Sequence, residues 1–357
     1  MTKPDVPSDL TQVDAGWLEA ALRAQSPDLR IAGCEQAQVI HGAATKLKLR
    51  VEYLNNPDGL PTELWVKGGW EPHSEWLAGM GTYTNEALFY REFKPRVPVA
   101  TPRCFFSAAA PNGNSVVVLE DLRQRGARLD SCIAGVPVAQ MYLSLENLAR
   151  LHARWWNDPE IDDHPAIRFP MRADDSSSDW PRRNGPDVMR EFFDKPRGAV
   201  IPSSVKDAER IDRAFWKMLH DMPHARPFVL LHGDPHPNNT YVDADGAPGL
   251  YDWQTLSKGP WAYDVAYHMV TSLSVGDRRR HDRDLIRHYL ECVAAHGVAR
   301  VPTYDEAWNA VRGYIAYSLH IWLTNPEPFQ SEESCAAMME RLGAAAEDYD
   351  FFERWGV

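Results

Sequence analysis

Alternating polar and apolar residues predict β-strands in the first third of the chain. Between residues 46 and 53, Leu47, Leu49 and Val51 alternate with basic side chains, which is typical of a strand with one buried face. The β-branched run 115–119 is apolar and predicts a strand in the middle of a sheet. Two shorter segments, 36–40 and 64–67, are expected to be further strands.

The helical period appears twice before residue 120 and dominates after it. Asp14 can cap a short helix that runs to Leu22, and residues 86–93 predict a helix that must end by Pro95. Residues 138–156 keep one apolar helical face. Later elements are expected to be a buried strand at 228–231, a hairpin over 241–251, and a long helix that begins at a capping box, Thr303 to Glu306, and runs through Trp322.

This order of elements predicts an α+β chain with two lobes. We expect a small β-rich lobe over residues 1–119, a hinge over 120–124 and a larger, mainly helical lobe over 125–357. Residues 157–200 are rich in Pro, Asp, Ser and Arg. We interpret this stretch as a long surface insertion that is able to move.

Composition and charge narrow the class of protein. The chain has 357 residues, of which 44% are apolar and 25% charged, the profile of a globular enzyme rather than a disordered chain. Its 38 Lys and Arg against 50 Asp and Glu give a formal charge of −12. This charge disfavours nucleic acids and anionic membranes as partners, because both are bound by basic surfaces.

Cysteine use and the N-terminus predict a cytoplasmic location. The five cysteines are odd in number and widely spaced, with no C-x-x-C pair, so neither a disulfide framework nor a cysteine zinc site is expected. Residues 1–10 are polar and contain two prolines, unlike a signal peptide. No apolar run approaches the ~20 residues that span a bilayer.

The strongest chemical signal is the stretch 231–239, Leu-His-Gly-Asp-Pro-His-Pro-Asn-Asn, followed by Asp252 at the end of the predicted hairpin. Phosphoryl transfer from a nucleotide needs a carboxylate that orients and deprotonates the accepting hydroxyl, and it needs oxygen ligands for Mg²⁺. Asp234 fits the first role, and Asn239 and Asp252 fit the metal ligands. The pattern therefore predicts Mg²⁺-dependent phosphoryl transfer.

These motifs resemble the aminoglycoside phosphotransferase and choline kinase superfamily, which has the protein-kinase-like fold. The pattern His-Gly-Asp-x-x-x-x-Asn over 232–239 matches the catalytic loop of that group, and Asp252-Trp-Gln stands where protein kinases have Asp-Phe-Gly. The segment 259–266 looks like a downstream segment of the group. The resemblance implies that His232 braces the catalytic loop and that Asp264 has a structural role.

The resemblance also implies a nucleotide-binding N-terminal lobe. It assigns Lys67 to the α- and β-phosphates of ATP and Glu86 to pairing with that lysine. A turn over the phosphates is expected between the first two strands, with one glycine where protein kinases have three. The backbone of the hinge is expected to meet the adenine. The residues concerned are Gly42, Ala43, Ala44 and Thr45 in the turn, and Glu120, Asp121 and Leu122 in the hinge.

The resulting hypothesis is direct, in-line transfer of the γ-phosphate of ATP to a hydroxyl of a small organic acceptor. Softer patterns, such as Asp264-Val-Ala-Tyr-His-Met, resemble the ecdysteroid-kinase-like bacterial phosphotransferases and favour an acceptor other than an aminoglycoside. The short stretch between Asp252 and Asp264 leaves little room for the peptide platform of a protein kinase. Two alternatives stay open: a catalytically inactive nucleotide-binding pseudokinase and a true aminoglycoside O-phosphotransferase.

Other features have ordinary explanations. The spacing of His220, His224, His232 and His236 is compatible with zinc, but two of these flank the predicted catalytic carboxylate, so zinc is not expected. His236 either faces the acceptor or packs within its loop. The basic run 278–280 is expected to be a solvated helix start, with contact to an anionic substrate as the alternative.

Overall fold

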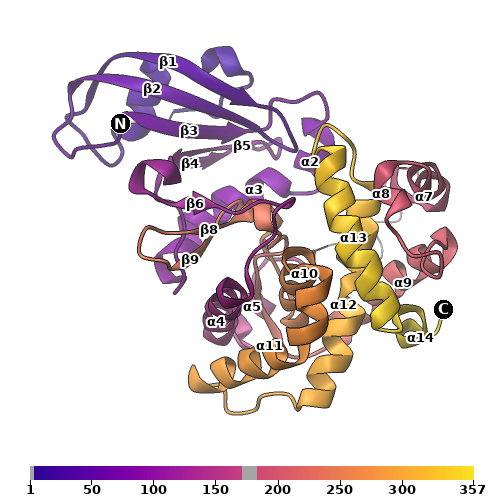
Figure 1. The fold of residues 1–357 in the computed structure, drawn as a ribbon. Helices are drawn as coiled ribbons and strands as arrows, with labels where there is room; N and C mark the ends of the chain where they lie inside the picture. The colour runs from indigo at the N-terminus through magenta and orange to yellow at the C-terminus, as the bar shows by residue number, and fades with distance from the viewer. Residues whose placement is uncertain (1–3, 171–182) are drawn as a thin grey trace. The chain divides into compact units, whose positions relative to one another are not determined.

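The computed structural model describes residues 4–170 and 183–357. They form two compact units, which are described in turn (Figure 1). Unit 1 comprises the described residues of Met1–Val97, Thr101–Ala127 and Asp252–Thr255, and unit 2 those of Pro98–Ala100, Arg128–Tyr251 and Leu256–Val357. Among the described residues, no helix is both long enough and apolar enough to cross a membrane.

Unit 1 is built on a five-stranded antiparallel sheet in the order β1-β2-β3-β5-β4 (Figure 1). The strands predicted from alternation are confirmed, and the expected central strand, β5, has a neighbour on each side. The strands are β1 (Arg30–Ile40), β2 (Thr45–Asn55), β3 (Glu63–Gly68), β4 (Cys104–Ala109) and β5 (Ser115–Glu120).

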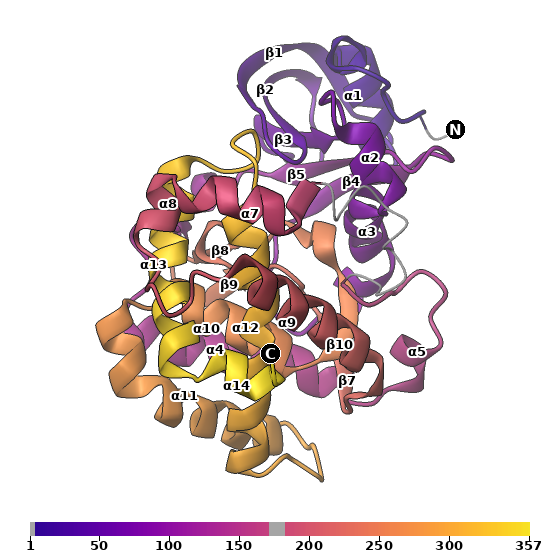
Figure 2. The ribbon, with the colours of Figure 1, turned by 90° about the vertical axis from the view of Figure 1, so that its right-hand side faces the viewer.

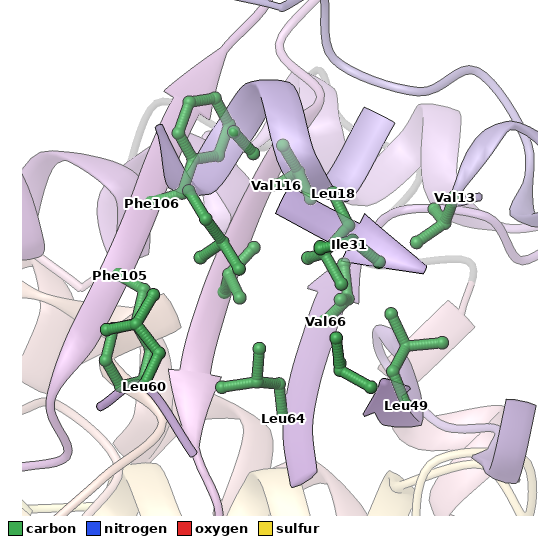
Figure 3. Close-up of a cluster of buried hydrophobic side chains, with 14 of the residues drawn as sticks. Val13, Leu18, Ile31, Leu49, Leu60, Leu64, Val66, Phe105, Phe106 and Val116 are labelled. Carbon is green, nitrogen blue, oxygen red and sulfur yellow. The ribbon is translucent and has the colours of Figure 1, made fainter. Parts of the chain in front are cut away.

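One face of this sheet carries the hydrophobic core of unit 1 (Figure 3). Leu47 and Leu49 of β2 are fully buried there, and helix α1 (Ala15–Leu22) places Leu18 in the same cluster. The Asp14 side chain accepts the Trp17 backbone N–H and so caps α1, as predicted. Each such leucine contributes ~1.5–3 kcal/mol of burial free energy. The alternation leaves the lysines of β2 on the opposite face.

Helix α3 (Thr82–Leu88) contacts β4 and β5 and follows the short helix α2 (Ser74–Gly79). The predicted helix over 86–93 is therefore corrected: it begins at Thr82, and its regular α-helical part ends at Leu88. The chain continues through one wider π-helical turn, Phe89–Phe93, and a 3₁₀ turn, Lys94–Arg96, that contains Pro95. Pro95 lacks an N–H, and it fits in a final turn where no regular ladder has to be continued.

Unit 2 contains two small sheets. Strands β6 (Arg128–Leu129), β8 (Thr240–Val242) and β9 (Pro248–Leu250) form one, and β7 (Phe228–Leu231) pairs with β10 (Ser257–Pro260) in the other. The predicted buried strand and the predicted hairpin are both confirmed. The hairpin requires Gly249, because a Cβ there would lie 2.1 Å from the Tyr241 ring.

The rest of unit 2 is helical (Figures 1 and 2). Every residue of α10 is buried, and α10 contacts α4, α12 and α13. The predicted capping box is present at the start of α12, with Thr303 and Glu306 bonded reciprocally. The described helices are α4 (Val138–Arg154), α5 (Pro159–Asp162), α7 (Pro186–Phe193), α8 (Pro196–Ala199), α9 (Ala208–Asp221), α10 (Ala262–Ser272), α11 (Val275–Ala295), α12 (Tyr304–Thr324), α13 (Glu332–Asp348) and α14 (Phe351–Trp355).

The interpretation of residues 157–200 as a surface insertion is corrected in part: most of its described residues are exposed or half-buried, as expected, but the segment also contains short helices and a few buried side chains. Residues 171–182 lie outside the described residues, but the rest includes α5, α7 and α8. Arg197 of α8 is fully buried. Its guanidinium bonds Glu332 at 2.6 Å and 2.9 Å and the carbonyl oxygen of Asn325 at 2.6 Å. Arg197 therefore ties this segment to the end of α12 and the start of α13, where helix-end carbonyls need donors.

The interpretation of residues 278–280 as a solvated helix start is also wrong in part. Ser274 caps α11, and Arg280 is exposed, as expected. Arg278, however, is buried and pairs with Asp282 at 3.5 Å and with Asp348, over the ring of Tyr349. A guanidinium whose charge is paired and which lies over an aromatic ring can be buried at acceptable cost.

Replacing Arg197 with Ala is expected to lower the free energy of unfolding by ~3–5 kcal/mol, because a buried charge pair loses one partner. Denaturant unfolding measures this. Arg190→Ala is the matched control on α7: Arg190 is exposed and pairs with exposed Asp187 and Glu209, so its midpoint should not change measurably. Equal midpoints for the two variants would contradict the anchoring role of Arg197.

The Arg197–Glu332 pair also predicts a pH dependence. Burial raises the pKa of Glu332, but hydrogen bonds from Arg197 outweigh it and hold that pKa below its ordinary value of 4.5. A carboxyl whose pKa is lowered by folding stabilises the fold above its ordinary pKa, and this contribution is lost as the pH falls through the lowered value. Glu332→Gln should therefore be less stable than wild type at neutral pH, and the difference should shrink in acid. A difference that is constant down to strong acid would contradict the assignment.

Candidate functional site

Lys67, Glu86 and Asp252, predicted from the sequence as a phosphate-binding pair and a metal ligand, lie together in unit 1. The Lys67 Nζ is 2.8 Å from Glu86 Oε2 and 2.6 Å from Asp252 Oδ1. Lys67 and Glu86 are buried, and the Asp252 side chain keeps 13% of its surface exposed. One ammonium thus bridges a carboxylate from α3 and a carboxylate from the segment 252–255.

Burial and the nearby charges shift the pKa values of the two carboxyl groups of this cluster in opposite directions. Burial raises the pKa of Glu86, and the Lys67 ammonium offsets this only in part. Burial also raises the pKa of Asp252, but the ammonium groups of Lys67 and Lys46 outweigh it and hold the Asp252 pKa well below its usual range. Asp252 is therefore ionised at neutral pH and offers two anionic oxygens.

The segment that carries Asp252 is fixed by three contacts to α3 and the turn that follows it. Besides the Lys67 bridge, Asn85 Nδ2 donates to the carbonyl oxygen of Gln254 at 3.1 Å. The ring of Phe89 stacks on Trp253, with centroids 3.8 Å apart. Asp252 has φ 64°, in the left-handed region that few residues other than glycine adopt. These contacts hold the carboxylate in that conformation.

The predicted phosphate turn, residues 41–45, joins β1 to β2 and is bonded to residues 71–83. Thr45 Oγ1 donates to Glu71 Oε1 at 2.6 Å, and the Tyr83 hydroxyl donates to the carbonyl oxygen of Ala43 at 2.7 Å. His73 Nε2 lies 3.0 Å from the carbonyl oxygen of Gly42. Ala44 is buried. Side chains from outside the turn therefore fix its backbone, so that the turn can keep its conformation with a single glycine.

The predicted hinge follows β5 directly. Glu120 Oε1 accepts the Arg103 backbone N–H at 2.7 Å, and the Asp121 side chain caps a short 3₁₀ turn that begins at Leu122. Asp121 also lies 2.9 Å from the Lys48 Nζ. The carboxylates of Glu120 and Asp121 are thus engaged within unit 1.

Asp234 lies in a polar cluster in unit 2. Its Oδ2 is 3.2 Å from His236 Nε2 and 3.1 Å from Asn239 Nδ2. Burial raises the pKa of Asp234, but the charge and hydrogen bond of His236, together with a hydrogen bond from Tyr267, hold it below its ordinary value. Burial lowers the pKa of His236, but the nearby Asp234 raises it to about 10. Asp234 is therefore an anion beside a cationic imidazole.

The loop 232–236 is held from α10 by a buried carboxylate. Asp264 Oδ2 accepts the His232 backbone N–H at 2.7 Å, and Asp264 Oδ1 accepts the Gly233 backbone N–H at 3.0 Å. Gly233 has φ 88°, a conformation that favours glycine. His232 Nε2 lies 2.9 Å from the carbonyl oxygen of Tyr251 and its Nδ1 accepts the Asp234 N–H at 3.3 Å. His232 thus links Asp234 to the residue before Asp252.

Three further residues, His268, Tyr267 and Trp322, also contact this loop. His268 Nδ1 donates to the carbonyl oxygen of Pro235 at 2.7 Å. Tyr267 bonds Asp234 and accepts the Trp322 indole N–H at 2.8 Å. His236 packs within the loop and against Trp322, one of the two possibilities given above. Tyr267 and His268 stand three and four residues after Asp264, a helical spacing that places all three on one face.

In each unit, the predicted magnesium ligand presents an oxygen atom of the kind that Mg²⁺ prefers. Asn239 Nδ2 donates to the backbone oxygen of Asp234 at 2.9 Å and to its side chain, so its amide oxygen is the atom left for a ligand. Asp252 is anionic. Hard oxygen ligands of this kind suit Mg²⁺.

Comparison with protein families identifies the chain. The model of the phosphotransferase enzyme family matches residues 73–305, well over half of the chain. This stretch includes Glu86, Asp234, Asn239, Asp252 and Asp264. A search of curated proteins found no significant match.

Solved structures that are described as kinases resemble this fold, although their sequence identity to the chain is low. An ethanolamine kinase from Plasmodium vivax has a TM-score of 0.52 and 12% identity, covering 92% of this chain and 83% of its own. A choline/ethanolamine kinase family protein from Mesorhizobium loti has a TM-score of 0.46 and 16% identity, with coverages of 90% and 91%. A choline kinase from Streptococcus pneumoniae has a TM-score of 0.48 and 12% identity, with coverages of 91% and 97%.

These identities are low enough that the likeness concerns the fold alone. The predicted α+β, kinase-like fold is confirmed, with its β-rich N-terminal region and helical C-terminal region. The predicted superfamily is confirmed as well. The chain belongs to the phosphotransferase enzyme family.

Proposed function

We propose that the protein transfers the γ-phosphate of ATP to a hydroxyl group of a small organic acceptor. The ionised carboxylate of Asp234 carries this proposal. Its side chain keeps 29% of its surface exposed, whereas His236 and Asn239, which hold it, are buried. A fixed, partly exposed carboxylate in this loop is suited to accept a hydrogen bond from the hydroxyl group of the acceptor molecule.

The lowered pKa of Asp234 defines its role. A carboxylate with a low pKa is a weak base, so it does not remove the proton before the phosphoryl group moves. Phosphoryl transfer passes through a loose transition state in which the attacking oxygen keeps its proton until late. Asp234 would therefore orient the hydroxyl by accepting its hydrogen bond, and take the proton as the new P–O bond completes.

The phosphate chain of ATP would be held by other residues. Lys67, kept in place by Glu86 at 2.8 Å, would bind the α- and β-phosphates. The turn 41–45 and the backbone of 120–122 are the proposed contacts for phosphates and adenine. Asn239 and Asp252 are the proposed ligands of Mg²⁺, which would neutralise charge on the phosphate oxygens when bound. Positioning and electrostatics supply most of such catalysis.

The surroundings of Asp234 favour a neutral acceptor over a polycationic drug. Five described residues that interact with its charge are His232, His236, Asn239, Tyr267 and Tyr317. None of these five is acidic, and two are tyrosines. A polycation would need several carboxylates at its binding site. We therefore favour an acceptor other than an aminoglycoside.

Asp234→Asn is expected to lower turnover ~10²–10⁴-fold, because the hydroxyl loses the anion that orients it. The dissociation constant for ATP should change little, since the residues proposed to bind its phosphates and adenine are untouched. The assay is mass spectrometry of a mixed panel incubated with protein, Mg²⁺ and ATP. The panel contains aminoglycosides, macrolides, choline, sterols, aromatic alcohols and hydroxyacyl thioesters.

A matched control is Asp284→Asn, which alters an exposed aspartate on α11 and should leave turnover unchanged. One compound that gains a phosphate with wild type and the control, but not with Asp234→Asn, supports the proposal. Normal turnover by Asp234→Asn contradicts the role of this residue. Tight ATP binding by the wild type with no product from any acceptor favours an inactive nucleotide-binding module instead.

A further inference from the structure

We propose that Lys46 is a second phosphate-binding lysine of the nucleotide site, acting beside Lys67. The inference rests on the proposed function, because it concerns the same ATP site. Lys46 lies on the polar face of β2, and its ammonium group helps to keep the pKa of Asp252 low. The observations that give it a role are its pairing across the sheet, the carboxylate it shares, and the charge balance of the cluster.

Lys46 and Lys67 are directly opposite each other in the antiparallel pair β2–β3. Side chains at opposite positions project from the same face of a sheet. Here both reach the same carboxylate: the Lys46 Nζ is 3.2 Å from Asp252 Oδ2, and the Lys67 Nζ is 2.6 Å from Asp252 Oδ1. Each oxygen of Asp252 therefore has its own ammonium.

Two lysines opposite each other normally destabilise a sheet, since like charges repel at this spacing. The Asp252 carboxylate between them offsets that repulsion. A pair of cations that needs an anion between them is suited to hold another anion in its place. The phosphate oxygens of a nucleotide are such anions, and they can replace Asp252 as the partner of Lys46.

The charge count of the cluster points the same way. Counted with both carboxylates ionised, Lys67, Glu86 and Asp252 sum to one net negative charge, which would repel a phosphate chain. Lys46 brings the sum to zero. With Lys46 included, a phosphate group approaches a neutral cluster with two donors in place of an anionic cluster with one.

Position, exposure and ion-pair partners distinguish Lys46 from the other two lysines, Lys67 and Lys48. Lys46 directly follows Thr45, the last residue of the predicted phosphate turn, and its side chain is 36% exposed, against 5% for Lys67. Lys48 projects from the same face, but it is committed elsewhere. Its Nζ is 2.6 Å from Glu63 and 2.9 Å from Asp121 in the predicted hinge. Lys46 is thus the lysine of β2 placed for phosphates.

The test compares a ligand that has phosphates with one that has none. Dissociation constants for ADP and adenosine, each with Mg²⁺, are measured by calorimetry on wild type, Lys46→Met, Lys46→Arg, Lys48→Met and Lys67→Met. Loss of a charge-assisted hydrogen bond should weaken ADP binding by Lys46→Met ~10–100-fold. Adenosine binding should not change. Lys46→Arg keeps the charge and should retain most of the preference for ADP.

Lys48→Met is the matched control, because Lys48 lies two residues along the same strand face. It should leave the ratio of the two dissociation constants at the wild-type value, since any effect through Asp121 acts on both ligands alike. Lys67→Met is the positive control and should reduce the preference for ADP over adenosine. Thermal unfolding without ligand, recorded for each variant, identifies any that do not fold.

Two different outcomes would contradict the role of Lys46 and the proposed nucleotide site, respectively. If wild type prefers ADP to adenosine and a folded Lys46→Met keeps that preference, Lys46 only neutralises Asp252 and the inference is wrong, while the proposed function stands. If wild type binds neither ligand, the proposed nucleotide site itself fails.

Discussion

The buried carboxylate of Asp264 is the constraint on which the candidate catalytic loop depends. It accepts two consecutive backbone N–H groups, of His232 and Gly233, that would otherwise be buried without partners. Asp264 can do this because α10 is buried along its whole length and cannot shift without opening the core of unit 2. The same helix adds His268 and Tyr267, so that one rigid element fixes the loop backbone and orients the Asp234 side chain.

In unit 1, the two faces of a single sheet have different roles: one packs in the hydrophobic core and the other carries the charged residues. Leu47 and Leu49 bury one face against α1, and this burial stabilises the register that sets Lys46 opposite Lys67. A slip of one residue would turn the leucines out and the lysines in, so the hydrophobic pattern also protects the charged one. On the charged face, α3 supplies Glu86, and the segment of Asp252 is held by Asn85 of α3 and by Phe89 of the turn that follows it.

Local patterns in the sequence were sufficient for most elements and for the residues of the motifs. The alternation in β2, the Asp14 cap and the Thr303 capping box are each decided by neighbours along the chain, and the structure has all three. Long-range contacts were not predictable in this way. Arg197 looks like a loop arginine until Glu332 and the end of α12 surround it. The wider turn after Leu88 and the partners of His236 likewise depend on packing between distant segments.

The central claim is that Asp234 orients an acceptor for direct phosphoryl transfer and is not itself phosphorylated. The stereochemical course at phosphorus tests this most directly. With ATP made chiral at the γ-phosphorus by oxygen isotopes, a single in-line displacement inverts the configuration in the phosphorylated acceptor. The account predicts inversion. Retention would require two displacements through a covalent phosphoenzyme and would contradict the role given to Asp234.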